Sequence, residues 1–156
     1  SSDVCSSDLE GSLYWLSQLY TSVNSHQDSY RINQEWLPIM KTKYAADPED
    51  WRSDDYSNGL GDQSFRAIFM KQYAEAEQLA LEGLSIDSTK TFIYSNLAAS
   101  LLFQGKYDEA EMIYRQYKDE LRDSFLDDFK QFAEAGVIPS ACEADVEKIK
   151  KMLDDE

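Results

Sequence analysis

Apolar side chains recur every three or four residues over most of the chain, and this period predicts helices rather than strands. The clearest stripe consists of Tyr94, Leu97, Ala98, Leu101 and Leu102. A second stripe follows it and consists of Tyr107, Ala110, Ile113, Tyr114 and Tyr117. Gly105 lies between the two stripes and predicts a tight turn, because glycine enters left-handed backbone conformations without steric cost. The two stripes are therefore expected to form a helical hairpin.

One segment of the chain recurs further along, because 69–77 reads FMKQYAEAE and 103–111 reads FQGKYDEAE. The preceding unit has the same plan, with stripes of Leu60, Ser64, Ala67 and Ile68 and of Tyr73, Ala76, Leu79, Ala80 and Leu84. Gly59 and Gly61 each cost about 1 kcal/mol inside a helix, which predicts that this first helix frays or begins late. Alternatively, Gly61 permits close packing against the helix before it. The offset between the two matching segments is the period of about 34 residues that is typical of one family of helix-turn-helix repeats.

Residues 57–124 resemble two consecutive tetratricopeptide repeats, 57–90 and 91–124. Both units have a small residue in the first helix, an aromatic residue that opens the second, and a small residue three positions later. In chain order these pairs are Ser64 and Ala98, Tyr73 and Tyr107, and Ala76 and Ala110. The resemblance implies an all-α, right-handed superhelix. Ser88 and Arg122 replace the proline that usually ends a repeat, and Tyr117 replaces a small residue, so the second unit is expected to run on or turn unusually at its end.

In this family, the first helices of successive repeats line a concave groove that binds peptide segments. The corresponding positions here are Asn58, Gly61, Asp62, Phe65, Ile68 and Phe69, then Phe92, Ser95, Asn96, Ala99, Leu102 and Phe103. Asn96 has a donor and an acceptor for a peptide backbone. The Lys/Arg set with which chaperone-binding members hold a C-terminal carboxylate is absent from these positions, so an amphipathic or basic partner helix fits better. The alternative is that Phe65, Phe69 and Phe103 belong to the core or are covered by neighbouring helices.

The N-terminal flank is expected to form a degenerate helical pair over 10–48. Its first stripe consists of Leu13, Leu16, Leu19, Tyr20 and Val23. A second helical stripe covers 30–46, and Pro38 inside it predicts a kink or a late start, because an interior proline costs about 3 kcal/mol. The polar residues 49–56 predict a loop.

The C-terminal flank, 125–156, is expected to form a pair of capping helices and an acidic tail that ends the natural chain. Ser124 is a candidate N-cap for the first helix, whose apolar residues are Phe125, Phe129 and Phe132. Gly136 predicts its end. Ser140 and Glu143 have the spacing of a capping box before a helix with Val146, Ile149 and Leu153. Such a pair would cover the apolar face that stacked repeats leave exposed at the end of an array.

The first nine residues, SSDVCSSDL, resemble the translation of a common sequencing adapter rather than a natural segment. The alternative is an ordinary Ser/Asp-rich tail. The adapter interpretation predicts a gene assembled from environmental DNA and a natural chain that continues upstream of about Glu10. It also predicts that Cys5 is not native, and that the native net charge is −13 once Asp3 and Asp8 are removed from the printed value of −15.

Composition narrows the possible functions. Thirty acidic against 15 basic residues disfavour nucleic acid and anionic membranes as partners, because binding to either depends on Lys and Arg. An apolar fraction of 42% suffices for a real core, and no apolar run is long enough to span a membrane. Two cysteines and one histidine offer little material for a disulfide framework, a zinc site or a His-based triad. We therefore expect no catalytic residue, no cofactor and no metal.

A few side chains could still carry chemistry. The doublets Asp54-Asp55, Asp127-Asp128 and Asp154-Asp155 could hold a metal, but adjacent helical residues diverge, which favours a solvated surface. His26 could act as a base, although no motif brings a nucleophile near it, so a position in a loop or at a helix end is favoured. Cys142 could be activated at a helix start, but no basic neighbour supports this, and packing is favoured.

Together these features predict a non-catalytic protein-interaction scaffold that forms the C-terminal part of a larger bacterial, cytoplasmic protein. Its partner would be a peptide, a helix of another protein or another domain of the same chain. Two alternatives remain open: the regulatory tail of an upstream protease-like or kinase-like enzyme, and repeat-mediated self-assembly.

Overall fold

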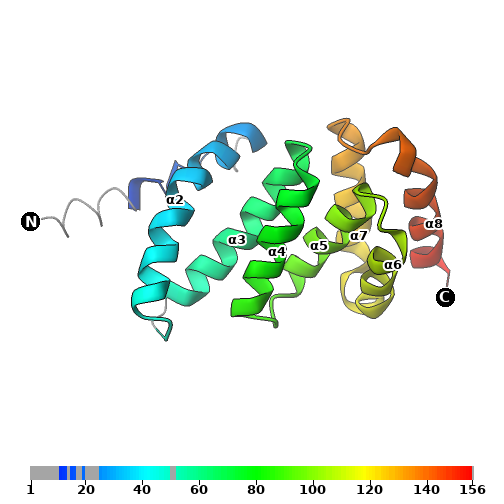
Figure 1. Cartoon of the computed structure of the whole chain (residues 1–156). Coiled ribbons are helices and arrows are strands. Elements are labelled where there is room, and N and C mark those ends of the chain that lie inside the picture. Colours follow the sequence, from blue (N-terminus) through cyan, green and yellow to red (C-terminus); the bar gives the residue numbers. More distant parts are fainter. Residues whose placement is uncertain (1–10, 14, 17–18, 20–24, 50–51, 156) are drawn as a thin grey trace, which may run out of the picture.

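The computed structural model describes residues 11–13, 15–16, 19, 25–49 and 52–155. These residues are helical apart from short connections, and the described part of the chain contains no strand, so the all-α prediction is confirmed. The helices follow one another across the molecule in Figure 1. They are α2 (His26–Ala46), α3 (Arg52–Phe69), α4 (Tyr73–Ile86), α5 (Thr91–Phe103), α6 (Tyr107–Gln116), α7 (Lys118–Glu134), the 3-10 turn η1 (Ser140–Cys142) and α8 (Glu143–Asp154).

Helices α3 and α4 form one hairpin and α5 and α6 form another, and their turns have the same backbone geometry at equivalent positions. In the second turn Gly105 has a φ of 77°, and the Lys106 amide donates to the Leu101 carbonyl at 3.0 Å. In the first turn Lys71 adopts a φ of 58°, and the amide of Gln72 donates to the carbonyl of Ala67 at 2.9 Å. The predicted turn at Gly105 is confirmed, and its equivalent, Lys71, adopts a conformation that favours glycine.

The glycines of α3 lie where neighbouring helices come close, and the helix does not fray at them. A Cβ at Gly59 would lie 2.2 Å from a ring carbon of Trp36 in α2. A Cβ at Gly61 would lie 2.7 Å from the ring of Phe92 in α5. The prediction of a frayed or late helix is therefore wrong, since α3 begins at Arg52. The close neighbour of Gly61 is the helix after the hairpin rather than the helix before it.

The N-terminal predictions hold only in part. Leu13 is buried, whereas Leu16 and Leu19 are exposed; Tyr20, Val23 and the first nine residues lie outside the described residues. Helix α2 runs through Pro38 from His26, so the late start is wrong. The predicted loop at 49–56 is shorter, because residues 52–56 already belong to α3.

The exit from the second hairpin is unusual, as Tyr117 and Arg122 predicted. Helix α6 ends at Gln116, and α7 begins at Lys118 with only Tyr117 between them. Ser124 lies inside α7 and cannot cap it, so that prediction is wrong, and the expected boundary between 124 and 125 falls within this helix. Helix α7 therefore begins at Lys118, well before residue 124, where the second repeat was expected to end.

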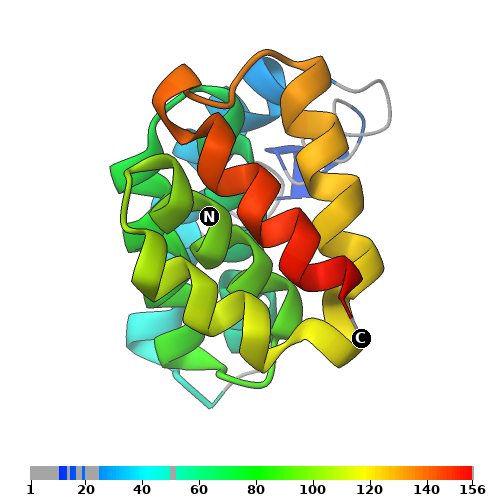
Figure 2. The same ribbon diagram turned by 90° about the vertical axis from the view of Figure 1, so that its right-hand side faces the viewer.

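Two further signals near the C-terminal end have different outcomes. Gly136, with a φ of 67°, follows α7 as predicted. The capping box is wrong, because Ser140 belongs to η1 and no side-chain bond caps α8. In Figure 2, α8 crosses the near end of the molecule between α6 and α7. Its residues Val146 and Ile149 are buried there.

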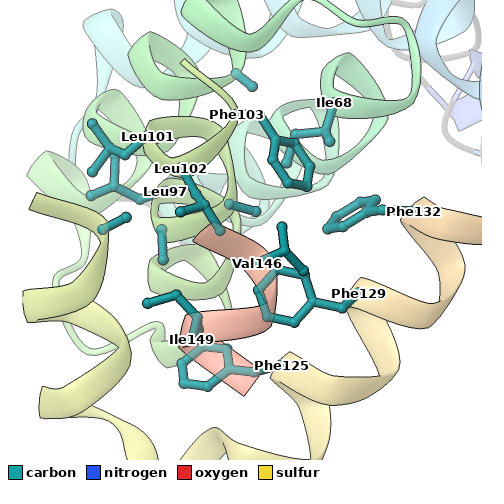
Figure 3. Packing of buried hydrophobic residues seen from close by; sticks show 14 of the residues in the cluster. Ile68, Leu97, Leu101, Leu102, Phe103, Phe125, Phe129, Phe132, Val146 and Ile149 are labelled. Carbon is teal, nitrogen blue, oxygen red and sulfur yellow. The ribbon is translucent and has the colours of Figure 1, made fainter. Parts of the chain in front are cut away.

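The main core lies where α7 and α8 meet α5 and α6. The rings of Phe125, Phe129 and Phe132 point from α7 into this core, each about 1% exposed (Figure 3). Phe125 and Phe129 meet the ring of Tyr114 with centroid distances of 4.8 and 5.5 Å. The core thus anchors α7 along one face, and the adjacent face of the helix lines the site described next.

Candidate functional site

The predicted groove positions on α3 and α5 divide into two regions. Those near the middle of α3 and the start of α5 line a cavity of about 340 Å³, and we call this region the open half: Gly61, Asp62, Phe65, Phe92, Ser95 and Asn96. Those toward the C-terminal ends of both helices are buried, and we call this region the closed half: Ile68, Phe69, Ala99, Leu102 and Phe103. Asn58 lines neither region, and its side chain donates to Asp54 at 3.2 Å.

The closed half is covered by the end of α7. The ring centroid of Phe132 lies 5.2 Å from that of Phe69, 5.5 Å from that of Phe103 and 5.7 Å from that of Phe65. Such ring contacts add to the free energy gained by burial. Phe69, Ala99, Leu102 and Phe103 are therefore core residues, which corrects their assignment to a ligand-binding groove.

The open half has a third wall that the sequence analysis missed. Leu121, Ser124 and Asp128 of α7 line the cavity, and so does Arg66 of α3. The three α7 residues share one helical face, beside the face that carries the buried phenylalanines. Their spacing is visible in the sequence, but the repeat pattern assigns residues 118–124 to the end of the previous helix. Phe92 is 43% exposed and is the large exposed apolar side chain of this region.

Asn96 ties the two walls of the cavity together. Its side-chain Nδ2 donates to the carbonyl oxygen of Gly61 at 2.8 Å, and the residue is only 5% exposed. A buried side-chain amide without a partner would be costly, so this bond stabilises the close approach of α3 and α5. One of the two Nδ2 protons of Asn96 is therefore used within the protein rather than for a peptide backbone.

One end of the cavity holds a compensated charge cluster. Asp62 accepts from Arg66 at 3.1 Å and from Asn33 at 2.9 Å. The other terminal nitrogen of Arg66 lies 2.7 Å from Nδ1 of His26. The ring of His26 stacks on that of Phe69, with 3.6 Å between the ring centroids. Burial and the adjacent Arg66 lower the pKa of His26 to about 4. His26 is therefore neutral at physiological pH and accepts the bond from Arg66, at the start of α2 as predicted.

The other end of the cavity holds the carboxylate of Asp128, which accepts fewer hydrogen bonds than that of Asp62. Asp128 is partly buried and accepts a hydrogen bond from Ser95 Oγ at 2.6 Å. The pKa of Asp128 is raised to about 6 by burial and by the charge of Asp127, against the lowering effect of the Ser95 bond. Burial is the main cause because it disfavours the charged form. Asp128 therefore carries a negative charge at neutral pH that costs free energy.

The remaining chemical candidates do not converge on a site. The described residues contain no cluster of His, Cys, Asp and Glu arranged to hold a metal ion. Asp54 pairs with Lys90 and Asp154 with Arg122 at the surface. Cys142 is buried, and burial raises the pKa of its thiol. Among the described residues, no helix has the length and apolar character required to span a membrane.

In comparisons with known proteins, no family model, no curated protein and no solved structure matches this chain. The functional argument therefore depends on the cavity between α3, α5 and α7 and on the chemistry of the side chains that line it.

Proposed function

We propose that this chain is a non-catalytic protein-interaction module built from tetratricopeptide-like hairpins, and that it holds a segment of a partner polypeptide in the open half. Support for the repeat comes from equivalent positions of the two hairpins that have the same environment. Ala76 and Ala110 are both fully buried where a second helix packs on its first. Tyr73 and Tyr107 both open a second helix.

The observation that carries the proposal is a cavity with one exposed aromatic wall. Surface aromatic rings beside a partly buried pocket are typical of binding sites, because they offer apolar area at small entropic cost. Phe92 provides that ring, and Asp62 and Asp128 give the cavity acidic groups. A volume of about 340 Å³ is at the lower end of ligand pockets, so it suits anchoring side chains of a peptide rather than a whole helix.

Peptide display tests this proposal. A library of random peptides is selected on the wild-type protein, and enriched peptides are then measured against two variants. Phe92→Ala removes the aromatic wall of the cavity without adding a charge. Leu81→Ala is the matching truncation on α4, at a residue that is 44% exposed and does not line the cavity.

The proposal predicts that enriched peptides lose at least about tenfold in affinity for Phe92→Ala, which corresponds to about 1.4 kcal/mol, and bind Leu81→Ala as they bind the wild type. A library that yields no binder, or binders that lose affinity equally for both variants, would contradict it.

A further inference from the structure

Among the residues that the structure describes, none with a positive charge pairs with Asp128, which distinguishes it from the other carboxylate of the cavity. Asp62, on the opposite wall, has Arg66 at 3.1 Å. No ion pair formed within the described part of the chain reaches Asp128, whose hydrogen bond comes from the neutral hydroxyl of Ser95. A partly buried charge without a counter-charge is costly. A ligand that supplied a positive charge would remove this cost on binding.

The groups around Asp128 leave its charge uncompensated. Ser95 faces it from α5, and Tyr114, whose own pKa is raised by burial and by Asp128, faces it from α6. Asp127 on the same helix adds negative charge. On α3, the guanidinium of Arg66 already bonds to the carboxylate of Asp62 and to the neutral ring of His26. The ionised groups that line the cavity are thus two carboxylates and one guanidinium.

We propose that the cavity binds a lysine or arginine side chain of the partner polypeptide, with its charged group paired to Asp128. This inference rests on the proposed function and names the residue chemistry that the site selects. Phe92, Phe65 and Leu121 form the apolar part of the lining, which suits the aliphatic stem of such a side chain. The faces of aromatic rings also attract cations. The net charge of −15 favours a basic partner at longer range.

The test uses short acetylated, amidated peptides in four sets that differ only in the central residue: arginine, lysine, citrulline or norleucine. The other positions are random mixtures of alanine and leucine. Citrulline matches the shape of arginine without its charge, and norleucine matches the stem of lysine. Affinity is measured for the wild type, for Asp128→Asn and for Asp127→Asn. Asp127 is the matched control, because it is exposed and bonded to Gln131 on the outer side of α7.

The arginine and lysine sets are expected to bind the wild type about tenfold more tightly than their neutral counterparts. Asp128→Asn should remove this preference, and Asp127→Asn should keep it. In the wild type the preference should also fall as the pH drops through about 6, because Asp128 becomes protonated there. This pH series needs no variant, so it remains decisive even if Asp128→Asn fails to fold.

Five outcomes would overturn the inference, and the last two would also overturn the proposed function. Equal binding of all four sets, lost in Phe92→Ala, would leave the proposed function standing without a cationic anchor. A preference that Asp127→Asn removes as fully as Asp128→Asn would assign it to general surface charge. Equal affinity for free n-butylammonium would assign the cavity to a small amine. Peptide binding that Phe92→Ala does not weaken, or no binding at all, would overturn both the inference and the proposed function.

Discussion

The open and closed halves of the inner face lie on the same two helices, yet they differ in what covers them. In the closed half, Phe69 and Phe103 are in contact with Phe132 and are 8% and 4% exposed. In the open half, Phe92 is 43% exposed beside a cavity. This difference in exposure does not come from a difference between the two repeated units. Phe69 and Phe103 occupy equivalent positions in successive units, and both are covered.

The difference comes from the direction of α7. Its C-terminal end brings Phe132 against α3 as well as α5, while its earlier residues line the cavity without filling it. A helix can fill part of an inner face with its own side chains and leave the rest for a ligand. The position along α3 and α5, rather than the repeat unit, decides which residues are core and which are available.

The largest expected effect is in the closed half. Phe132→Ala removes a ring that is 1% exposed and meets three other aromatic rings. We expect it to lower the free energy of unfolding by about 3–5 kcal/mol, the usual cost of a large buried cavity. Urea denaturation followed by circular dichroism measures this change. A loss below about 1 kcal/mol would mean that the closed half is not part of the core.

Asp128 should have an intermediate effect of opposite sign. Its pKa is about 6 in the folded protein and 3.8 in the unfolded chain, so the folded state binds more protons between these values, and stability falls as the pH rises. Asp128→Asn is therefore expected to raise the free energy of unfolding at neutral pH by about 1–2 kcal/mol after allowance for solvent screening. Below the lower pKa the gain should vanish. A destabilised variant at neutral pH would contradict this explanation.

His26 should give a smaller pH effect in the opposite direction. Its pKa is lowered from 6.5 to about 4, so the unfolded chain takes up a proton first as the pH falls. The stability from neutral His26 is present in full above pH 6.5 and is lost as the pH drops toward 4. In the wild type the opposite pH dependence of Asp128 would mask this loss, so the effect is measured in Asp128→Asn. The free energy of unfolding of that variant should fall by about 1 kcal/mol over this range. Adding His26→Asn to this variant should flatten the plot of unfolding free energy against pH. An unchanged slope would contradict the assignment of this pH dependence to His26.

The smallest effect on stability is expected in the open half. Phe92→Ala removes a ring that already contacts solvent, so the free energy of unfolding should fall by less than about 1 kcal/mol. The same variant should weaken peptide binding about tenfold, because it removes the aromatic wall of the cavity. Calorimetry on one protein sample measures both quantities. A large loss of stability without a loss of binding would reverse the roles of the two halves.

The sequence predicted the hairpins well because their signals are local. The apolar period of α5 and α6 and the turn at Gly105 depend on residues close together in the chain. The start of α7 was missed, because Tyr117 joins two helices without a glycine or proline. Local propensity does not show where such a continuous stretch changes direction.

The site could be predicted only in part for a related reason. Phe92 and Phe103 both lie on the predicted groove face. Nothing in the local sequence pattern distinguishes a ring that is exposed to solvent from a ring that another helix buries. The distinction depends on Phe132, which is distant in sequence. Likewise, Ser95 and Asp128 are far apart in the chain, so their hydrogen bond has no local signal.

The central claim is that the open half binds a partner segment while α7 stays packed on the closed half. Aromatic NMR of the protein with carbon-13-labelled phenylalanine, titrated with the arginine-centred peptides, tests this directly. If the claim is right, the ring signals of Phe65 and Phe92 move while those of Phe69, Phe103 and Phe132 stay in place. Movement of Phe69, Phe103 and Phe132 together, with Phe92 unchanged, would show that the ligand displaces α7 and would contradict the account.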